Sequence, residues 1–204
     1  MDKRFEKRAF RGAELRLSDG DGSSGPRLSG YIARFNSPSE DFGGWIEQIA
    51  PGAFKESIER DDIRALWNHN NDLVLGRTSA GTLKLTEDEI GLAFENTPPD
   101  TAWVKDRLVT LRRKDVTGSS FGFYTDADEW ATKADGMRVR TLIKATLVEV
   151  SPGVTFPAYP QANTEAAQRS LDAWLKSKGP EQPSPDLVEF EMRSRRLQMQ
   201  RLVL

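Results

Sequence analysis

The sequence contains no cysteine. Thiol nucleophiles, disulfide bonds and cysteine-ligated zinc or iron–sulfur sites are therefore excluded. A chain of 204 residues buries roughly 70% of the surface that its unfolded form exposes, so its core needs neither a disulfide nor a metal. The composition is compatible with a reducing compartment, and we expect a cytosolic protein.

The sequence also lacks an excess of one charge and any long apolar run. Its 29 basic and 31 acidic side chains give a formal net charge of -2, which argues against a surface that neutralises many phosphates. No stretch approaches the length that spans a bilayer. We therefore expect no nucleic acid and no membrane as a partner.

Alternating apolar and polar side chains dominate the first two thirds of the chain and predict a mostly β domain. Two short helices interrupt this pattern. One is expected over residues 51–60, and the other begins after Pro99 with Asp100 as its N-cap. The expected strands cover residues 13–18, 27–35, 44–49, 62–69, 73–78, 82–86 and 91–96, the segment from Ser119, and two strands around the Asp135–Gly136 turn.

Residues 1–162 are expected to form one domain, and residues 163–204 a C-terminal helical extension. The extension begins with an amphipathic helix whose N-cap is Thr164. Residues 179–186 form a proline-rich linker, and a second amphipathic helix follows. Such a helix usually packs on a partner or on its own domain.

The segment "TGSSFGF", residues 117–123, contains two adjacent serines. In a regular strand Phe121 and Phe123 share one face with Ser119, whereas Ser120 shares the other with Gly122. The phenylalanines are expected to point into the core. Ser120 would then face outward beside Gly122, where a missing side chain lets another backbone, such as that of a peptide substrate, approach closely.

A serine hydroxyl is a poor nucleophile unless a base takes its proton, and histidine is the usual base. The only histidine is His69. It is expected at the end of a strand on the same side as Ile63, Ala65 and Trp67, ahead of a polar loop. From the residues alone, a turn serine and a surface or packing histidine remain alternatives.

Glu149 ends a long predicted strand in which Ile143, Ala145 and Leu147 share its face, so a carboxylate terminates an apolar row. It precedes an apolar, proline-rich stretch that is expected to be buried. A solvent-facing glutamate is the alternative. A carboxylate-metal hydrolase that uses Asp61, Asp62, Asp126 or Asp128 is a further alternative, although these residues read as turn residues.

Four blocks in order, "GYIARFNSPS", "WNHNNDLVLGRT", "GSSFGF" and "LVEVSPGVTFPAYPQA", resemble the prohead maturation proteases of tailed bacteriophages, which are distant relatives of herpesvirus assemblin. The resemblance covers residues 13–162. It implies an α+β fold with a mostly antiparallel, β-barrel-like core, flanking helices and a C-terminal helical extension. It also implies a serine endopeptidase that cuts capsid and scaffold proteins inside the assembling procapsid in the host cytoplasm, and that often cuts itself.

Carried over by position, the resemblance implies that Ser120 is the nucleophile, His69 the general base and Glu149 the acidic member of a triad. Gly122 would lie where the acyl group of the substrate approaches, and backbone N–H groups would hold the oxyanion. No cofactor and no metal are expected, and homo-oligomerisation is left open. The herpesvirus relatives use a second histidine in the triad, which this sequence does not contain.

The chain departs from the family pattern at Gly153, which stands between Pro152 and Val154 where relatives run directly into valine. This departure predicts a small displacement of Glu149 or a bulge. A second hypothesis from another functional class is a non-catalytic scaffold protein, in which the β domain is inert and the terminal helix makes capsid contacts.

Overall fold

The computed structural model describes most of the chain, namely residues 5–10, 14–19, 25–155 and 165–178. The chain divides into two compact units, Met1–Gln168 and Arg169–Leu204. The described strands all lie in the first unit. The predicted domain boundary at residues 162 and 163 falls in a segment outside the described residues, and the division into domains stays a prediction.

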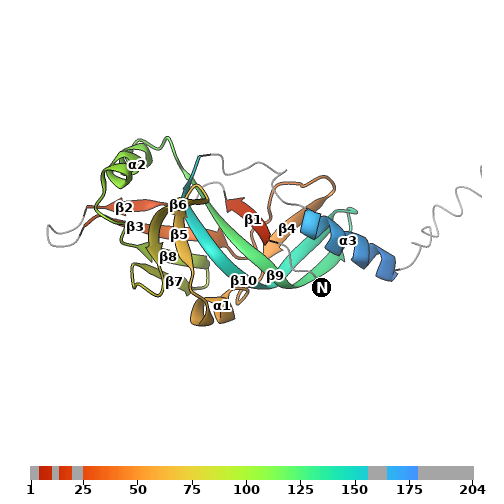
Figure 1. Ribbon diagram of the computed structural model, residues 1–204. Coiled ribbons are helices and arrows are strands. Elements are labelled where there is room, and N and C mark those ends of the chain that lie inside the picture. Colours follow the sequence, from red (N-terminus) through yellow and green to blue (C-terminus); the bar gives the residue numbers. More distant parts are fainter. Residues whose placement is uncertain (1–4, 11–13, 20–24, 156–164, 179–204) are drawn as a thin grey trace, which may run out of the picture. The chain divides into compact units, whose positions relative to one another are not determined.

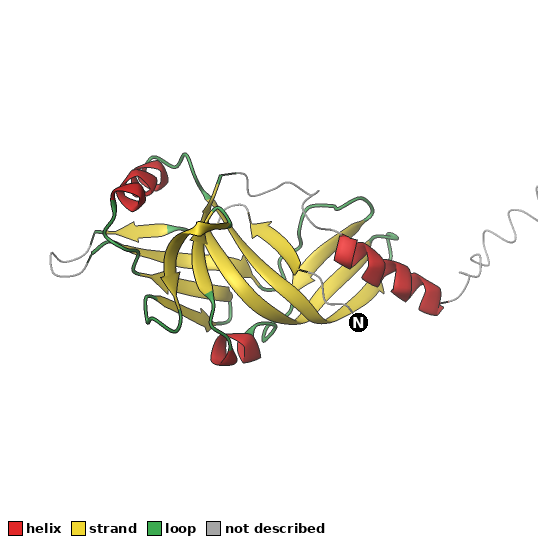
Figure 2. Ribbon diagram, in the orientation of Figure 1, coloured by secondary structure: helices red, strands yellow, loops and turns green. Residues whose placement is uncertain are grey.

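Two sheets built mostly from antiparallel pairs form the first unit (Figures 1 and 2). The larger sheet has the order β1-β9-β10-β5-β6, with β4 also paired to β10, and the smaller sheet has the order β2-β3-β8-β7. Among the described strands, β4 and β5 alone pair in parallel, both with β10. The described strands are β1 Phe5–Phe10, β2 Arg16–Ser18, β3 Arg27–Arg34, β4 Trp45–Ile49, β5 Arg64–Trp67, β6 Asn70–Arg77, β7 Leu83–Glu87, β8 Gly91–Asn96, β9 Gly118–Thr132 and β10 Arg138–Val154.

The two longest strands, β9 and β10, run antiparallel and curve side by side across the larger sheet (Figure 1). The turn that joins them contains Gly136 at a φ of 84°, a left-handed conformation that suits glycine. Strand β9 is continuous from Gly118 to Thr132, so the segment from Ser119 and the first strand of the predicted hairpin form one strand. The expected α+β fold with a strand-rich, curled sheet is confirmed.

Three helices are described: α1 Lys55–Arg60, α2 Ala102–Arg112 and α3 Glu165–Lys178. Helix α1 is shorter than predicted, because Pro51 lies in the turn that precedes it. The N-cap of α2 is Thr101, and Asp100 instead pairs with Lys105 at 2.6 Å, so the predicted cap is wrong by one residue. Helix α3 lies where a helix was predicted, whereas Thr164, residues 179–186 and the second helix of the extension lie outside the described residues.

The core is one cluster of buried side chains drawn from both sheets and from helix α2. Phe121 on β9 stacks edge-on against Phe54, with ring centroids 5.3 Å apart, and lies 5.0 Å from Phe123 on the same strand. The smaller sheet contributes Ile32 and Phe94. One face of β9 therefore packs into the core, and the side chains of its other face point away from that core.

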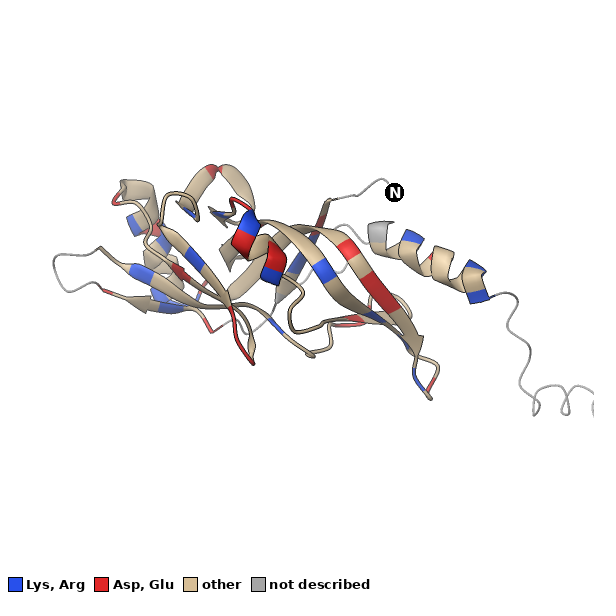
Figure 3. Cartoon of the chain, turned by 90° about the horizontal axis from the view of Figure 1, so that it is seen from below, with Lys and Arg blue, Asp and Glu red and all other residues tan. Residues whose placement is uncertain are grey.

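Charged residues of both signs are spread over strands and helices rather than gathered on one element (Figure 3). Among the described residues, no helix combines the length and the apolar character that crossing a membrane requires.

Candidate active site

Strand β9 presents its two adjacent serines to opposite faces, as its parity predicts. Ser119 lies on the core face with two fully buried phenylalanines, and its hydroxyl donates a hydrogen bond to the Ile32 carbonyl at 3.0 Å. Ser120 lies on the other face with Gly122. Ser120 was expected to face outward, but only 1% of it is exposed. Its Oγ donates a hydrogen bond to the Arg8 carbonyl of β1 at 2.7 Å.

A bulge in β10 brings Glu149 to the same face as Ser120. Leu147 pairs with Phe123, but the next pair joins Glu149 to Gly122, so Val148 is an extra residue in β10. An extra residue reverses the alternation of side chains. Glu149 therefore leaves the apolar face of Leu147, and the expectation that the two residues share a face is wrong.

An earlier bulge changes the phase of the same strand around Lys144. Leu142 is consequently fully buried, whereas Ile143, which was expected in the apolar row, is only half-buried. The predicted row is therefore correct only for Ala145 and Leu147. A third irregularity between Pro152 and Val154 is the bulge that the inserted Gly153 predicts. Gly153 has a φ of 144°, and a Cβ there would lie 2.5 Å from the Trp67 ring.

His69 occupies the second position of the two-residue turn between β5 and β6. Trp67 pairs with Asn70, and the two residues between them have left-handed backbones, with φ of 51° at Asn68 and 59° at His69. Positive φ at both central positions is the geometry of a tight hairpin turn, and asparagine and histidine tolerate it better than most residues. His69 is thus in the turn and not in the regular strand that the sequence predicted.

His69 and Glu149 form a direct side-chain contact. The distance between His69 Nδ1 and Glu149 Oε1 is 2.5 Å, and the two side chains are 16% and 6% exposed. An ionised carboxylate can only accept a hydrogen bond, so with Glu149 ionised the proton of this contact belongs to Nδ1. In a neutral imidazole the lone pair is then on Nε2, the nitrogen that can act as a base.

Ser151 links the His69–Glu149 pair to the sheet. The sequence had not identified this residue. Its hydroxyl donates to Glu149 Oε2 at 2.9 Å and accepts the His69 backbone N–H at 3.0 Å. It is fully buried, and its ladder partner on β9 is Ser120. The same hydroxyl therefore fixes the turn that carries the histidine and orients the carboxylate that holds the imidazole.

Ser120 is close to this pair in the ladder but not bonded to it. Ser120 pairs with Ser151, and Gly122 pairs with Glu149, so all four residues lie on one face of adjacent strands. Among the hydrogen bonds of the described residues, none joins Ser120 to His69. The structure therefore brings the predicted base and acid together, and leaves the predicted nucleophile bonded to β1.

The space above Gly122 is filled by two side chains. A Cβ at this position would lie 2.3 Å from Phe5 Cζ and 2.6 Å from Glu149 Oε1. Atoms at these distances overlap, so the glycine is required for the carboxylate and the Phe5 ring to sit where they do. In this structure a ring of β1 occupies the place that was predicted for an approaching substrate.

A buried cluster of charged side chains fixes β1 beside β9. Arg8 contacts Glu47 at 2.6 Å and Glu6 at 2.7 Å, and Arg140 contacts Glu47 at 2.7 Å, Glu6 at 2.9 Å and Asp128 at 2.6 Å. Four of these side chains are less than 8% exposed, the exception being Asp128. No strand was expected at Glu6 and Arg8, and the other three residues are single charges on separate strands, so the sequence carried no signal of the cluster.

Burial by itself raises the pKa of Glu6, but the hydrogen bond from Arg140 and the charges of Arg8 and Arg140 outweigh it and hold that pKa below its usual value. Burial likewise lowers the pKa of Arg140, and the charge of Glu47 and the hydrogen bond to Glu6 more than reverse this effect. Glu6 thus favours its charged form although it is buried, because its carboxylate is hydrogen-bonded and paired with Arg8 and Arg140.

The four aspartates considered as metal ligands bind other side chains instead. Asp61 accepts from Ser57 and Arg60, and Asp62 pairs with Arg77, which lowers the pKa of Asp62 mainly through their hydrogen bond. Asp126 accepts from Thr146 and Asp128 from Arg140. Within the part of the chain that the structure describes, no three His, Asp or Glu side chains are grouped as metal ligands.

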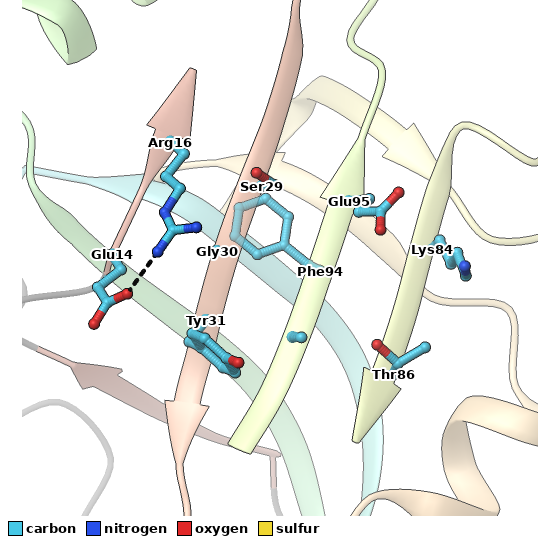
Figure 4. A pocket seen from close by; sticks show the side chains of 10 residues that line it. Glu14, Arg16, Ser29, Gly30, Tyr31, Lys84, Thr86, Phe94 and Glu95 are labelled. Atoms are coloured by element: carbon cyan, nitrogen blue, oxygen red, sulfur yellow. Dashed lines mark hydrogen bonds and ion pairs between the residues drawn. The ribbon is translucent and has the colours of Figure 1, made fainter. Parts of the chain in front are cut away.

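An open pocket lies elsewhere, on the smaller sheet (Figure 4). Strands β2, β3, β7 and β8 line it with polar and charged side chains, and Glu14 contacts Arg16 across one side. None of the four predicted site residues lines this pocket.

Hydrolases that use a serine nucleophile have a histidine that contacts both a carboxylate and the serine. The structure has the contact between histidine and carboxylate, with Ser120 on the neighbouring strand β9. The chain belongs to the caudovirus prohead serine protease family, whose model matches residues 13–177.

Two further comparisons were made. The structure of the bacteriophage T4 capsid assembly protease, gp21, is similar to this chain with a TM-score of 0.44 and 10% sequence identity, over 73% of this chain and 98% of that chain. No curated protein sequence matches the chain.

Proposed function

We propose that the protein is a serine endopeptidase that processes capsid and scaffold proteins inside the assembling procapsid in the host cytoplasm, and that also cuts itself. Ser120 is the nucleophile, His69 the general base and Glu149 the acid that orients the base. The observation that carries this proposal is the 2.5 Å contact between His69 Nδ1 and Glu149 Oε1, one strand away from Ser120 on the same sheet face. Membership of the family supports it.

In the reaction, Nε2 of His69 takes the Ser120 proton while Oγ attacks the peptide carbonyl. The imidazolium that results is stabilised by the Glu149 carboxylate, and it returns the proton to the leaving amine. Water then attacks the acyl-enzyme by the same route and frees Ser120. The Ser120 hydroxyl must first exchange its hydrogen bond to the Arg8 carbonyl for one to His69.

The test compares Ser120→Ala with Ser119→Ala, a matched control because the two serines are neighbours on opposite faces of β9. Each variant is expressed with the capsid precursor, and the products are identified by intact mass spectrometry. We expect Ser120→Ala to abolish cleavage and Ser119→Ala to retain it. If both variants still cleave the precursor, the assignment of Ser120 is refuted. If the unmutated chain never cleaves the precursor, the non-catalytic scaffold is favoured.

A self-cleavage test uses the purified protein alone. We expect it to lose its C-terminal segment through the linker at residues 179–186 at neutral pH, because a linker of this composition is a preferred site for proteolysis. Equal loss of the segment from Ser120→Ala would point to a contaminating protease.

A further inference from the structure

The hydroxyl of Ser120 is engaged with the protein's own first strand. It donates to the Arg8 carbonyl at 2.7 Å, and the residue is 1% exposed. A nucleophile in this state can neither pass its proton to His69 nor touch a protein substrate. Catalysis by Ser120 therefore requires that something beside it moves.

Strand β1 is the neighbour whose position explains this state. It pairs with β9 from Phe5 opposite Tyr124 to Phe10 opposite Ser119, so an extended peptide lies along β9 on both sides of Ser120. The other edge of β9 is paired with β10 over its whole length. The edge that β1 occupies is thus the one place in the described sheet where another strand could pair with β9.

Two observations bear on what the departure of β1 would change. It lies before residues 13–177, the part that matches the family. It also contributes one acid and one base to the buried cluster, Glu6 and Arg8, so its departure removes a balanced pair of charges. Arg140 keeps its contacts with Glu47 and Asp128 at 2.7 and 2.6 Å, and no charge of the cluster is left alone.

We propose that the edge of β9 beside Ser120 is a binding site for an extended peptide strand, which β1 of the same chain and the peptide substrate occupy in turn. This inference rests on the proposed function. In the closed state the Arg8 carbonyl of β1 accepts the hydrogen bond from the Ser120 hydroxyl, and the Phe5 ring covers Gly122. When β1 leaves, Ser120 turns to His69, and the backbone of a substrate pairs with the vacated positions.

The first experiment locks β1 in place. Phe5→Cys with Tyr124→Cys puts two thiols at directly opposite positions of β1 and β9, within the reach of a cross-strand disulfide, in a chain that has no other cysteine. The control pair is Thr132→Cys with Arg138→Cys, which are opposite each other at the far end of β9 and β10. The probe is a fluorophosphonate reagent that labels activated serines, followed by intact mass, with Ser120→Ala as the blank.

We expect the oxidised β1 lock to label at least about tenfold more slowly than the same protein after reduction, since only the open fraction reacts. Oxidation of the control pair should leave the rate unchanged. Equal labelling of the locked and reduced forms would overturn the inference.

The second experiment releases β1 after folding. A recognition sequence for a site-specific protease is inserted between Phe10 and Glu14, and the folded protein is cut and diluted. Labelling should accelerate, and a synthetic peptide of residues 1–10 should slow it again in proportion to the peptide bound, as measured by fluorescence anisotropy. A peptide that rebinds and accelerates labelling would refute the inference, because β1 would then complete the active site.

A third outcome separates the two proposals. If the peptide rebinds but no form labels above the Ser120→Ala blank, the strand-binding site at β9 is supported. The assignment of Ser120 as nucleophile then fails, and sharing of the site with a substrate fails with it.

Discussion

Replacement of Gly122 by alanine tests whether the glycine is needed for the geometry of the acid. The added Cβ would lie 2.6 Å from Glu149 Oε1 and 2.3 Å from Phe5 Cζ. The backbone of Gly122 does not have a positive φ, so the methyl group acts by its volume alone.

The size of the effect follows from the two contacts. Non-bonded heavy atoms settle at about 3.5 Å, so the Glu149 carboxylate has to move by roughly 0.9 Å. That movement stretches its 2.5 Å contact with His69 Nδ1. A misplacement of about 1 Å in a reacting group can lower a rate by about 10²-fold, and overpacking costs about 1–3 kcal/mol of unfolding free energy.

We therefore expect kcat/KM for cleavage of the capsid precursor to fall by about 10²-fold in Gly122→Ala. Urea unfolding measures the loss of stability, and Gly25→Ala is the control because nothing lies within 4 Å of its Cβ. The double variant Phe5→Ala with Gly122→Ala removes the overlap with the Phe5 ring, and cleavage should stay low because the contact with Glu149 remains. A Gly122→Ala protein that cleaves at the wild-type rate would refute this account of the site.

Three further changes probe the hydrogen bonds described above. Ser151→Ala should lower kcat about 10-fold or more with little change in KM, because the His69 N–H and Glu149 Oε2 lose their shared partner, and Ser151→Thr should retain most of the activity if the hydroxyl is what matters. Glu149→Gln should lower kcat by about 10⁴-fold, because an amide can hold the wrong imidazole tautomer, and the loss of the Nδ1 proton signal in NMR would confirm the cause. Since the folded pKa of Glu6 lies below its unfolded value, this residue stabilises the protein above its unfolded pKa, and the contribution is lost as the pH falls through the folded pKa. Acid unfolding of Glu6→Gln followed by circular dichroism should therefore show a weaker dependence on pH below about 4.5 than the wild type, and an unchanged dependence would contradict the role of the buried cluster.

The sequence predicted the orientation of side chains correctly where strands are regular. Strand β9 has no bulge between Ser119 and Phe123, so alternation alone assigned Phe121 to the core and Ser120 to the other face. The same reasoning failed for β10, because nothing in the sequence around Val148 marks it as the extra residue of a bulge. Without that extra residue Glu149 would point into the core.

Local sequence patterns did not predict the tertiary contacts of the site. Ser151 reads as an ordinary strand residue, and its importance arises only from where the turn at His69 meets β10. The pairing of β1 with β9 joins segments more than a hundred residues apart, and Arg8 and Glu6 look like exposed charges until Arg140 is placed beside them. Long-range pairing of this kind depends on topology, which hydrophobic periodicity does not encode.

The turn that carries His69 has a consequence for how the site can change shape. Two residues are the shortest link between antiparallel strands, and both are already held from outside, Asn68 by the Gly153 carbonyl and His69 by the Ser151 hydroxyl. The backbone of the turn that carries the imidazole is thus held by hydrogen bonds at both of its residues. If the site changes between the closed and open states proposed above, we expect the change among the groups that surround Ser120 and not in the His69 turn.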